Sequence, residues 1–190
     1  MAESTTPVTV ETPIANPAPL GLCAFALTTF VLSAANAKLF AGEQIVLGLA
    51  LFYGGLAQLL AGMWEFKTGN TFGATAFSSY GAFWMAFAAT VYFKLVPDDP
   101  KGLAFFLLGW TIFTGIMLLA SLRTSVAIMV LFLLLFATFI VLTAGAFGVA
   151  VGALGGYLGL ATAIVAWYTA AAGLLAATKS PIVLPTGPRS

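Results

Sequence analysis

The stretch TSVAIMVLFLLLFATFIVLTAGAFGVAVGALGGYLGLATAIVAWYTAAAGLLAAT, residues 124–178, decides the fold. It holds 55 residues without a single charge. The hydrocarbon core of a bilayer is crossed by about 20 helical residues, so this stretch is long enough for two membrane helices. Its middle part, GAFGVAVGALGG (residues 145–156), contains five glycines and predicts the turn between the two helices.

The rest of the chain has the same character. Only 7% of its 190 residues are charged and 61% are hydrophobic, whereas a soluble domain carries roughly 25% charged residues. The outside of the molecule must therefore face lipid. The sequence predicts an all-α integral membrane protein with six transmembrane helices, at Pro19–Leu39, Ile45–Trp64, Thr71–Phe93, Leu103–Ala120, Val126–Ala144 and Leu154–Thr178.

The ends of the chain predict its organisation and orientation. Residues 1–15 are polar, with two glutamates and no basic residue, which differs from a signal peptide. We expect a disordered tail at 1–15, a six-helix transmembrane domain at 16–180 and a C-terminal tail at 181–190 that is also disordered. Six helices place both termini on one side. That side holds four basic residues against three on the other, which favours cytoplasmic termini in a cell membrane.

Polar residues repeat on single faces of several predicted helices. They are Thr29, Ser33 and Asn36 in the first helix, Gln58 and Glu65 in the second, and Thr71, Thr75 and Ser79 in the third. Amide and carboxyl groups are costly in hydrocarbon, so they face a cavity or a partner. These faces indicate a wetted path for a small polar solute. On the last helix one stripe, from Gly155 to Gly173, consists of small residues without a strongly polar member, and it indicates a helix-packing seam.

The composition argues against an enzyme. The chain has no histidine, and its one cysteine, Cys23, has no basic neighbour in the sequence, so neither a metal site nor an activated nucleophile is expected. No glycine-rich nucleotide loop follows a strand, and no cofactor or nucleic-acid partner is expected. A passive channel for anions or small neutral solutes and a structural scaffold remain as alternatives to a transporter.

Three motifs resemble the acetate uptake transporter (AceTr) family, which includes bacterial succinate–acetate permeases. They are NPAPLGL at Asn16–Leu22, FYGGLAQ at Phe52–Gln58 and GNTFGATAFSSYGAFW at Gly69–Trp84. The resemblance implies a cell-membrane permease or channel for acetate and related short carboxylates such as succinate. It also implies six helices around a narrow central pore and a homo-oligomer, a hexamer in the bacterial members.

The resemblance also implies a hydrophobic constriction formed by a Phe, a Tyr and a Leu. The Phe is Phe25, three residues after NPAPLGL, and the Tyr is Tyr80 in the SYG triplet. We place the Leu at Leu135, although LFLLLF offers several leucines. Asn16, Thr29, Ser33, Gln58 and Ser79 are candidates to bind the carboxyl group along the pore.

An apolar ring favours passage of neutral acetic acid over the acetate anion, because an unpaired charge is heavily penalised in a low dielectric. We therefore expect proton-linked transport. Glu65 is the candidate proton carrier, and its alternative role is an anchor at the headgroup level beside Trp64 and Lys67. NPAPLGL allows two helix starts, one with Asn16 as N-cap and Pro17 inside the helix, the other with Pro19 as the first helical residue.

Overall fold

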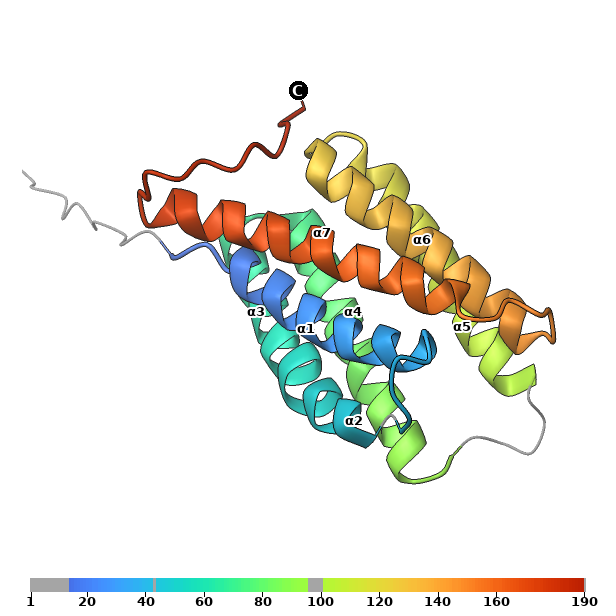
Figure 1. The fold of residues 1–190 in the computed structure, drawn as a ribbon. Helices are drawn as coiled ribbons and strands as arrows, with labels where there is room; N and C mark the ends of the chain where they lie inside the picture. The colour runs from blue at the N-terminus through green and yellow to red at the C-terminus, as the bar shows by residue number, and fades with distance from the viewer. Residues whose placement is uncertain (1–13, 43, 96–100, 190) are drawn as a thin grey trace, which may run out of the picture.

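The computed structural model describes residues 14–42, 44–95 and 101–189, and these form six continuous helices (Figure 1). They are α1 (Ala18–Asn36), a long helix composed of α2 (Gln44–Leu51), η1 (Phe52–Ala57) and α3 (Gln58–Thr68), then α4 (Thr71–Tyr92), α5 (Lys101–Ser121), α6 (Val126–Ala146) and α7 (Leu154–Ala177). The predicted bounds agree to within about one helical turn, and the all-α prediction is confirmed. Residues 1–13 of the N-terminal tail predicted at 1–15 lie outside the described residues.

Five of these helices are long and apolar enough to cross a membrane: α1, the combined Gln44–Thr68 helix, α5, α6 and α7. The chain is therefore a membrane protein. The remaining helix, α4, is equally long at 22 residues. Its hydropathy is lowered by hydroxyl residues such as Thr75 and Ser79, and it packs against α1, α2, η1, α3 and α5. Thr75 and Ser79 are partly buried by these neighbours, so α4 belongs to the ring despite its lower hydropathy.

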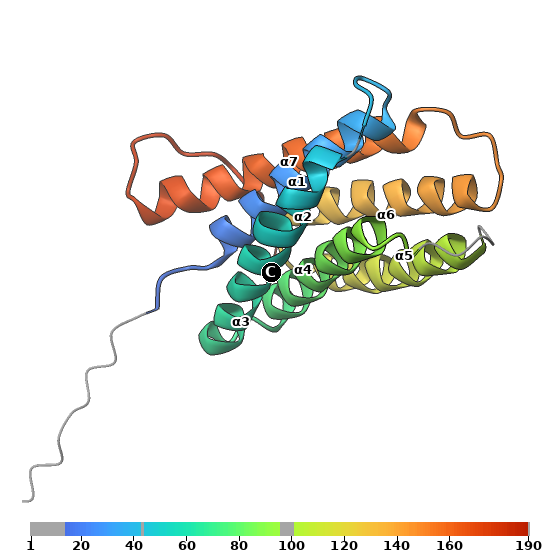
Figure 2. The same cartoon turned by 90° about the horizontal axis from the view of Figure 1, so that it is seen from below.

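The six helices form a closed ring. Consecutive contacts run from α1 to α7, α6, α5, α4 and α3, and α3 contacts α1 again. Figures 1 and 2 show α1 lying along α7, with α5 and α6 as a neighbouring pair. The N-terminus of α1, the turn from α3 to α4, the turn from α5 to α6 and the C-terminal end of α7 lie at one end of this ring.

The small residues of α7 form the packing seam that the sequence predicts. A Cβ atom added to Gly159 would collide with Ser33 Oγ on α1, and one added to Gly156 would lie 2.6 Å from the Cα of Ala37. A Cβ on Gly155 would instead meet Leu142 of α6 at 2.8 Å. The glycines thus let α7 approach both of its neighbours closely.

Local caps fix where the helices at the α1 end of the ring begin. Gly69 ends α3 in the left-handed conformation (φ 78°), and Asn70 Oδ1 accepts a hydrogen bond from Gly73 N at the start of α4. At α1, Asn16 Oδ1 accepts from Ala18 N at 3.0 Å, and Pro17 already has helical dihedrals. The observed helix begins at Ala18 with Pro17 as its N-cap residue, so it differs by one residue from both predicted starts. The Asn16 side chain still supplies a hydrogen bond at this end, and Pro17 is not extended.

Two features differ from the sequence-based expectations. Residues Phe52–Ala57 form a π-helix within the second span, where Gly54 and Gly55 bring the backbone close to Thr28 and Met85. The C-terminal segment was expected to be disordered, but residues 186–189 pair with the start of α6. That prediction is wrong, because the free N–H groups of a helix start give even a proline-rich segment hydrogen-bond donors.

Candidate functional site: two cavities inside the helix ring

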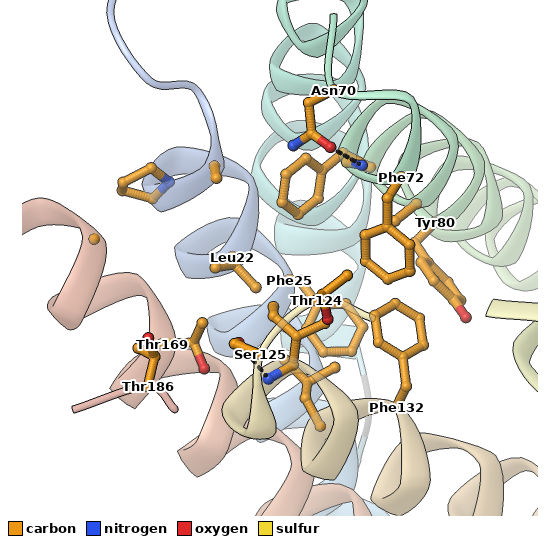
Figure 3. A pocket seen from close by; sticks show the side chains of 18 of the residues that line it. Leu22, Phe25, Asn70, Phe72, Tyr80, Thr124, Ser125, Phe132, Thr169 and Thr186 are labelled. Carbon is orange, nitrogen blue, oxygen red and sulfur yellow. Dashed lines mark hydrogen bonds between the residues drawn. The ribbon is translucent and has the colours of Figure 1, made fainter. Parts of the chain in front are cut away.

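The first cavity lies at the end of the ring where α1 begins. It has a volume of about 360 Å³ and is lined by residues of α1, α3, α4, α6 and α7 together with the C-terminal segment. Its wall is mostly aromatic and aliphatic, as the Phe25, Phe72 and Phe132 side chains in Figure 3 show. The polar residues of the wall are Asn16, Gln58, Asn70, Thr124, Ser125, Thr169 and Thr186. We call it cavity 1.

The second cavity lies toward the opposite end of the ring, next to the turn between α6 and α7. It has a volume of about 420 Å³ and is lined by α1, α4, α5, α6 and Val151 in that turn. Its polar residues are Thr29, Ser33, Asn36, Trp84 and Thr138. We call it cavity 2. None of the described residues that line either cavity carries a charge.

Three side chains line both cavities, and they are Phe25, Tyr80 and Leu135. They come from α1, α4 and α6 and are buried, with exposed fractions of 3–5%. The Phe25 and Tyr80 ring centroids are 5.9 Å apart. The structure therefore brings together the three residues predicted as a constriction and places them where the two cavities meet.

Tyr80 is held in place from outside the cavities. Its hydroxyl lies 2.8 Å from Thr114 Oγ1 on α5, and in Figure 3 this oxygen points away from the Phe25 side. Its ring also packs against Phe113 at 5.4 Å and Trp110 at 5.9 Å. With the hydroxyl engaged by α5, Tyr80 offers an apolar ring to the cavities.

The candidate carboxyl-binding residues divide between the cavities. Asn16 and Gln58 line cavity 1, and Thr29 and Ser33 line cavity 2. Gln58 Oε1 and Thr29 Oγ1 are buried, and no described residue offers either atom a hydrogen bond. Ser79 differs from this group, because it lines a separate pocket between α4 and α5 together with Trp110 and Phe113. The structure thus does not place Ser79 with the other four.

Glu65 is 1% exposed and points toward α4, whereas its neighbour Trp64 is 55% exposed. Its Oε2 accepts hydrogen bonds from Asn70 Nδ2 at 2.8 Å and from Thr68 Oγ1 at 3.2 Å. Glu65 Oε1 has no partner among the described residues. An anchor at the headgroup level needs an exposed side chain, so the buried position of Glu65 does not fit that alternative.

Sequence reasoning did not identify Asn70, Trp84 or Thr186 as cavity residues. Asn70 lies in cavity 1 and contacts Glu65, so it connects this buried carboxyl group to the cavity wall. Asn70 stands directly after Gly69, a position that indicates a helix cap. No separate signal in the sequence indicated that it also lines a cavity. Trp84 lies in cavity 2 with an indole N–H that no described residue accepts. Thr186 lies in the segment that was expected to be disordered.

The fold and the site define the class of the protein. It is an all-α membrane protein with two uncharged cavities that meet at three apolar side chains. The chain belongs to the GPR1/FUN34/yaaH family, which it matches over residues 2–189. The predicted resemblance to acetate transporters is thereby confirmed.

Three relatives illustrate the similarity. Acetate permease A of Emericella nidulans is 47% identical over 90% of this chain and 65% of its own length. The succinate-acetate/proton symporter SatP of Escherichia coli is 39% identical over 93% of this chain and 97% of its own length. The solved structure of the bacterial acetate channel SatP is 38% identical and covers 92% of this chain and 100% of its own, with a TM-score of 0.86.

The relatives differ in length. The chain spans slightly less than two thirds of Acetate permease A, but nearly all of the Escherichia coli protein.

Proposed function

We propose that this protein transports acetate and related short carboxylates across the cell membrane, in proton-linked form. The observation that carries the proposal is the meeting of cavities 1 and 2 at Phe25, Tyr80 and Leu135. It is supported by the relatives named as an acetate permease, a succinate-acetate/proton symporter and an acetate channel. The protein is a transporter and not an enzyme.

The chemistry of the walls suits a small carboxylic acid. The amide of Gln58 carries both a donor and an acceptor, so it is complementary to a neutral carboxyl group, which also carries both. The unpartnered Gln58 Oε1 accepts the acid O–H, and the Thr29 hydroxyl serves the same purpose in cavity 2. The acetate methyl group then passes between Phe25, Tyr80 and Leu135. Asn16 and Ser33 bind the carboxyl group nearer the two ends.

The absence of charge from the described cavity linings favours transport of acetate together with a proton. Neither cavity has a charged residue among its described lining, so an acetate anion would lose its hydration without compensation. Neutral acetic acid avoids this cost. A ring of apolar side chains also resists wetting and so limits ion leak. Movement of each molecule of acid thus carries one proton.

Glu65 takes part in this link through Asn70. The helices and π-helix that pack against α3, which are α1, η1 and α4, contain no charged residue. Within α3 the other charge is Lys67, whose side chain is exposed. Protonation of Glu65 therefore has no counter-charge to oppose it, and its hydrogen bond to Asn70 carries the change to the wall of cavity 1.

The proposal also covers the assembly of the protein and its orientation in the membrane. The protein assembles as a homo-oligomer, a hexamer, in the plasma or inner membrane with both termini in the cytoplasm. The end of the ring where cavity 1 lies holds four basic residues, which are Lys67, Arg123, Lys179 and Arg189. An excess of basic residues is typical of the cytoplasmic side, which supports this orientation. No cofactor or metal takes part.

The test is uptake of radiolabelled acetate by the purified protein in liposomes, with and without an inward proton gradient. Proton-linked transport requires faster uptake and accumulation above equilibrium when the gradient is present. A passive channel for anions or small neutral solutes, favoured by the uncharged cavity walls, equilibrates acetate and responds to membrane potential instead. A protein that moves no acetate under either condition contradicts both.

A further inference from the structure

The C-terminal segment after α7 runs from the end of α7 to the start of the neighbouring helix α6, at the end of the ring where cavity 1 lies (Figure 1). Figure 3 places Thr186 near Thr169 on one side of cavity 1, with Thr124 and Ser125 nearby. All four of these residues belong to the cavity wall. We call residues 181–189 the C-terminal strap.

The strap is attached to the start of α6 by backbone pairing. Val126 N donates to Gly187 O at 2.8 Å, Ala127 N donates to Thr186 O at 3.0 Å, and Arg189 N donates to Thr124 O at 2.9 Å. These bonds make Ser125 and Pro188 an antiparallel bridge pair. Tyr168 on α7 adds a side-chain bond, because its hydroxyl donates to Pro185 O at 2.7 Å.

This attachment occupies the free donors of a helix. The first N–H groups of a helix have no partner within it. At α6, Ser125 Oγ accepts from Ile128 N, while the strap carbonyls accept from Val126 and Ala127. The strap therefore contributes one residue, Thr186, to the wall of cavity 1 and also covers the helix N-terminus beside it.

The same contacts are few enough to break without unfolding the ring. Ile182 and Val183 of the strap are 60% and 82% exposed, so this part buries little apolar surface. The prolines at 181, 185 and 188 have no N–H and favour an extended chain. A segment held mainly by a few exposed hydrogen bonds, with little buried apolar area, opens locally at low free-energy cost.

We propose that the C-terminal strap is a gate over cavity 1, and that acetate passes when residues 186–189 detach from the start of α6. The proposal rests on the proposed transport function. Detachment removes Thr186 from the wall and frees the N–H groups of Val126 and Ala127 at the cavity mouth, where a helix N-terminus attracts a carboxylate. Reattachment closes the mouth again.

The bridge pair allows a direct test. Ser125 and Pro188 are the non-hydrogen-bonded pair of the bridge, in which Cα atoms are about 4.5 Å apart. That separation suits a disulfide. The variant Ser125→Cys, Pro188→Cys is prepared with Cys23→Ala, so that no other thiol competes. Radiolabelled acetate uptake is then measured in liposomes after oxidation and again after reduction.

The gate requires that the oxidised protein loses most of its uptake and that reduction restores it, while each single-cysteine protein shows no such difference. Equal uptake with a cross-link verified by mass spectrometry overturns the gate, and so does failure of the cross-link to form. A reduced protein that carries no acetate when the unmodified chain also carries none contradicts the transport function itself.

A second variant tests release instead of locking. Tyr168→Phe removes the bond to Pro185 and changes nothing else in the strap. We expect a faster initial uptake rate and easier proteolysis within residues 181–189. Tyr157→Phe on the same helix is the matched control, because Tyr157 is also exposed on α7 and lies outside the strap contacts. An unchanged rate together with increased proteolysis overturns the gate, since the strap would then detach without effect.

Discussion

Tyr80 shows how one side chain serves two purposes. Its hydroxyl bonds Thr114 at 2.8 Å, and its ring reaches the junction of the two cavities. Thr114 also donates to Trp110 O at 2.7 Å, so it keeps a partner if the phenol is removed. Loss of the hydroxyl in Tyr80→Phe should therefore cost only about 1 kcal/mol of stability. The ring lines both cavities, whereas the hydroxyl is bonded to α5.

This leads to a prediction on selectivity. Tyr80→Ala and Phe25→Ala should each widen the junction and admit larger acids such as succinate or lactate, because both side chains line both cavities. Competition of unlabelled acids against labelled acetate in liposomes measures the change. Phe72→Ala is the control, since Phe72 lines cavity 1 but not cavity 2. Selectivity as in the unchanged protein for both variants would place the constriction elsewhere.

A second prediction concerns Asn16. Its Oδ1 accepts from Ala18 N, and Asn16 lines cavity 1. Asp caps a helix about as well as Asn, so Asn16→Asp should fold normally. It should lose most acetate uptake at neutral pH, because an ionised carboxylate repels the substrate and donates no hydrogen bond.

Asn16→Ser is the control for this prediction, since serine also caps helices but adds no charge. We expect Asn16→Ser to retain much more uptake than Asn16→Asp, at equal expression. If Asn16→Asp transports acetate as well as the unchanged chain does, the side chain serves only to start α1.

Sequence reasoning reached the constriction only through the resemblance. Phe25 follows one motif and Tyr80 lies within another, so the motifs fix both positions, but Leu135 stands in LFLLLF, where every position is strongly apolar. The rotation of α6 decides which leucine points inward, and packing against α5 and α7 sets that rotation. Leu133, two residues away, is 52% exposed, whereas Leu135 is 4% exposed.

At the scale of elements, charge spacing was sufficient to predict the helices but not their internal irregularities. Runs without charge fixed the six spans to within about one turn. The π-helix at Phe52–Ala57 has no such signal. In the structure it lies where Gly54 closely approaches Thr28 and Gly55 closely approaches Met85, and these contacts are not visible in the sequence. The order of the C-terminal strap also depends on a distant partner, the start of α6.

The seam between α1 and α7 gives an element-scale prediction. A methyl group on Gly156 would lie 2.6 Å from Ala37 Cα, so Gly156→Ala must push α7 away from α1. We expect a loss of about 1–3 kcal/mol, as for other overpacked sites. Thermal unfolding in detergent measures it.

Gly48→Ala is the matched control for this substitution, because a Cβ there has no neighbour within 4 Å. Removing a glycine from a helix should leave stability unchanged or raise it by up to about 1 kcal/mol. Equal melting temperatures for Gly156→Ala and the unchanged protein would show that the seam is loosely packed.

At the scale of the whole molecule, the ring isolates the path from lipid and from charge. Its lining is uncharged, and the described charged residue most deeply buried is Glu65, at 1% exposed. Glu65 stands behind the wall, with Asn70 between it and cavity 1. A protonation event at this position can therefore alter the wall without placing a charge in the path.

The last prediction follows from this arrangement. Glu65→Gln keeps the size of the side chain and an oxygen that accepts from Asn70, but it cannot exchange a proton. If Glu65 provides the proton link, the variant should show a flattened pH dependence of net acetate uptake, while exchange of labelled for unlabelled acetate at equal pH continues. Exchange requires no net proton movement, so it also verifies folding. Thr68→Val is the control, because it removes the weaker 3.2 Å bond to the same carboxylate and leaves the carboxylate in place. We expect Thr68→Val to keep its pH dependence. A Glu65→Gln protein with active exchange and an unaltered pH profile would limit Glu65 to a structural contact with Asn70, and the proton would then cross only as part of the neutral acid.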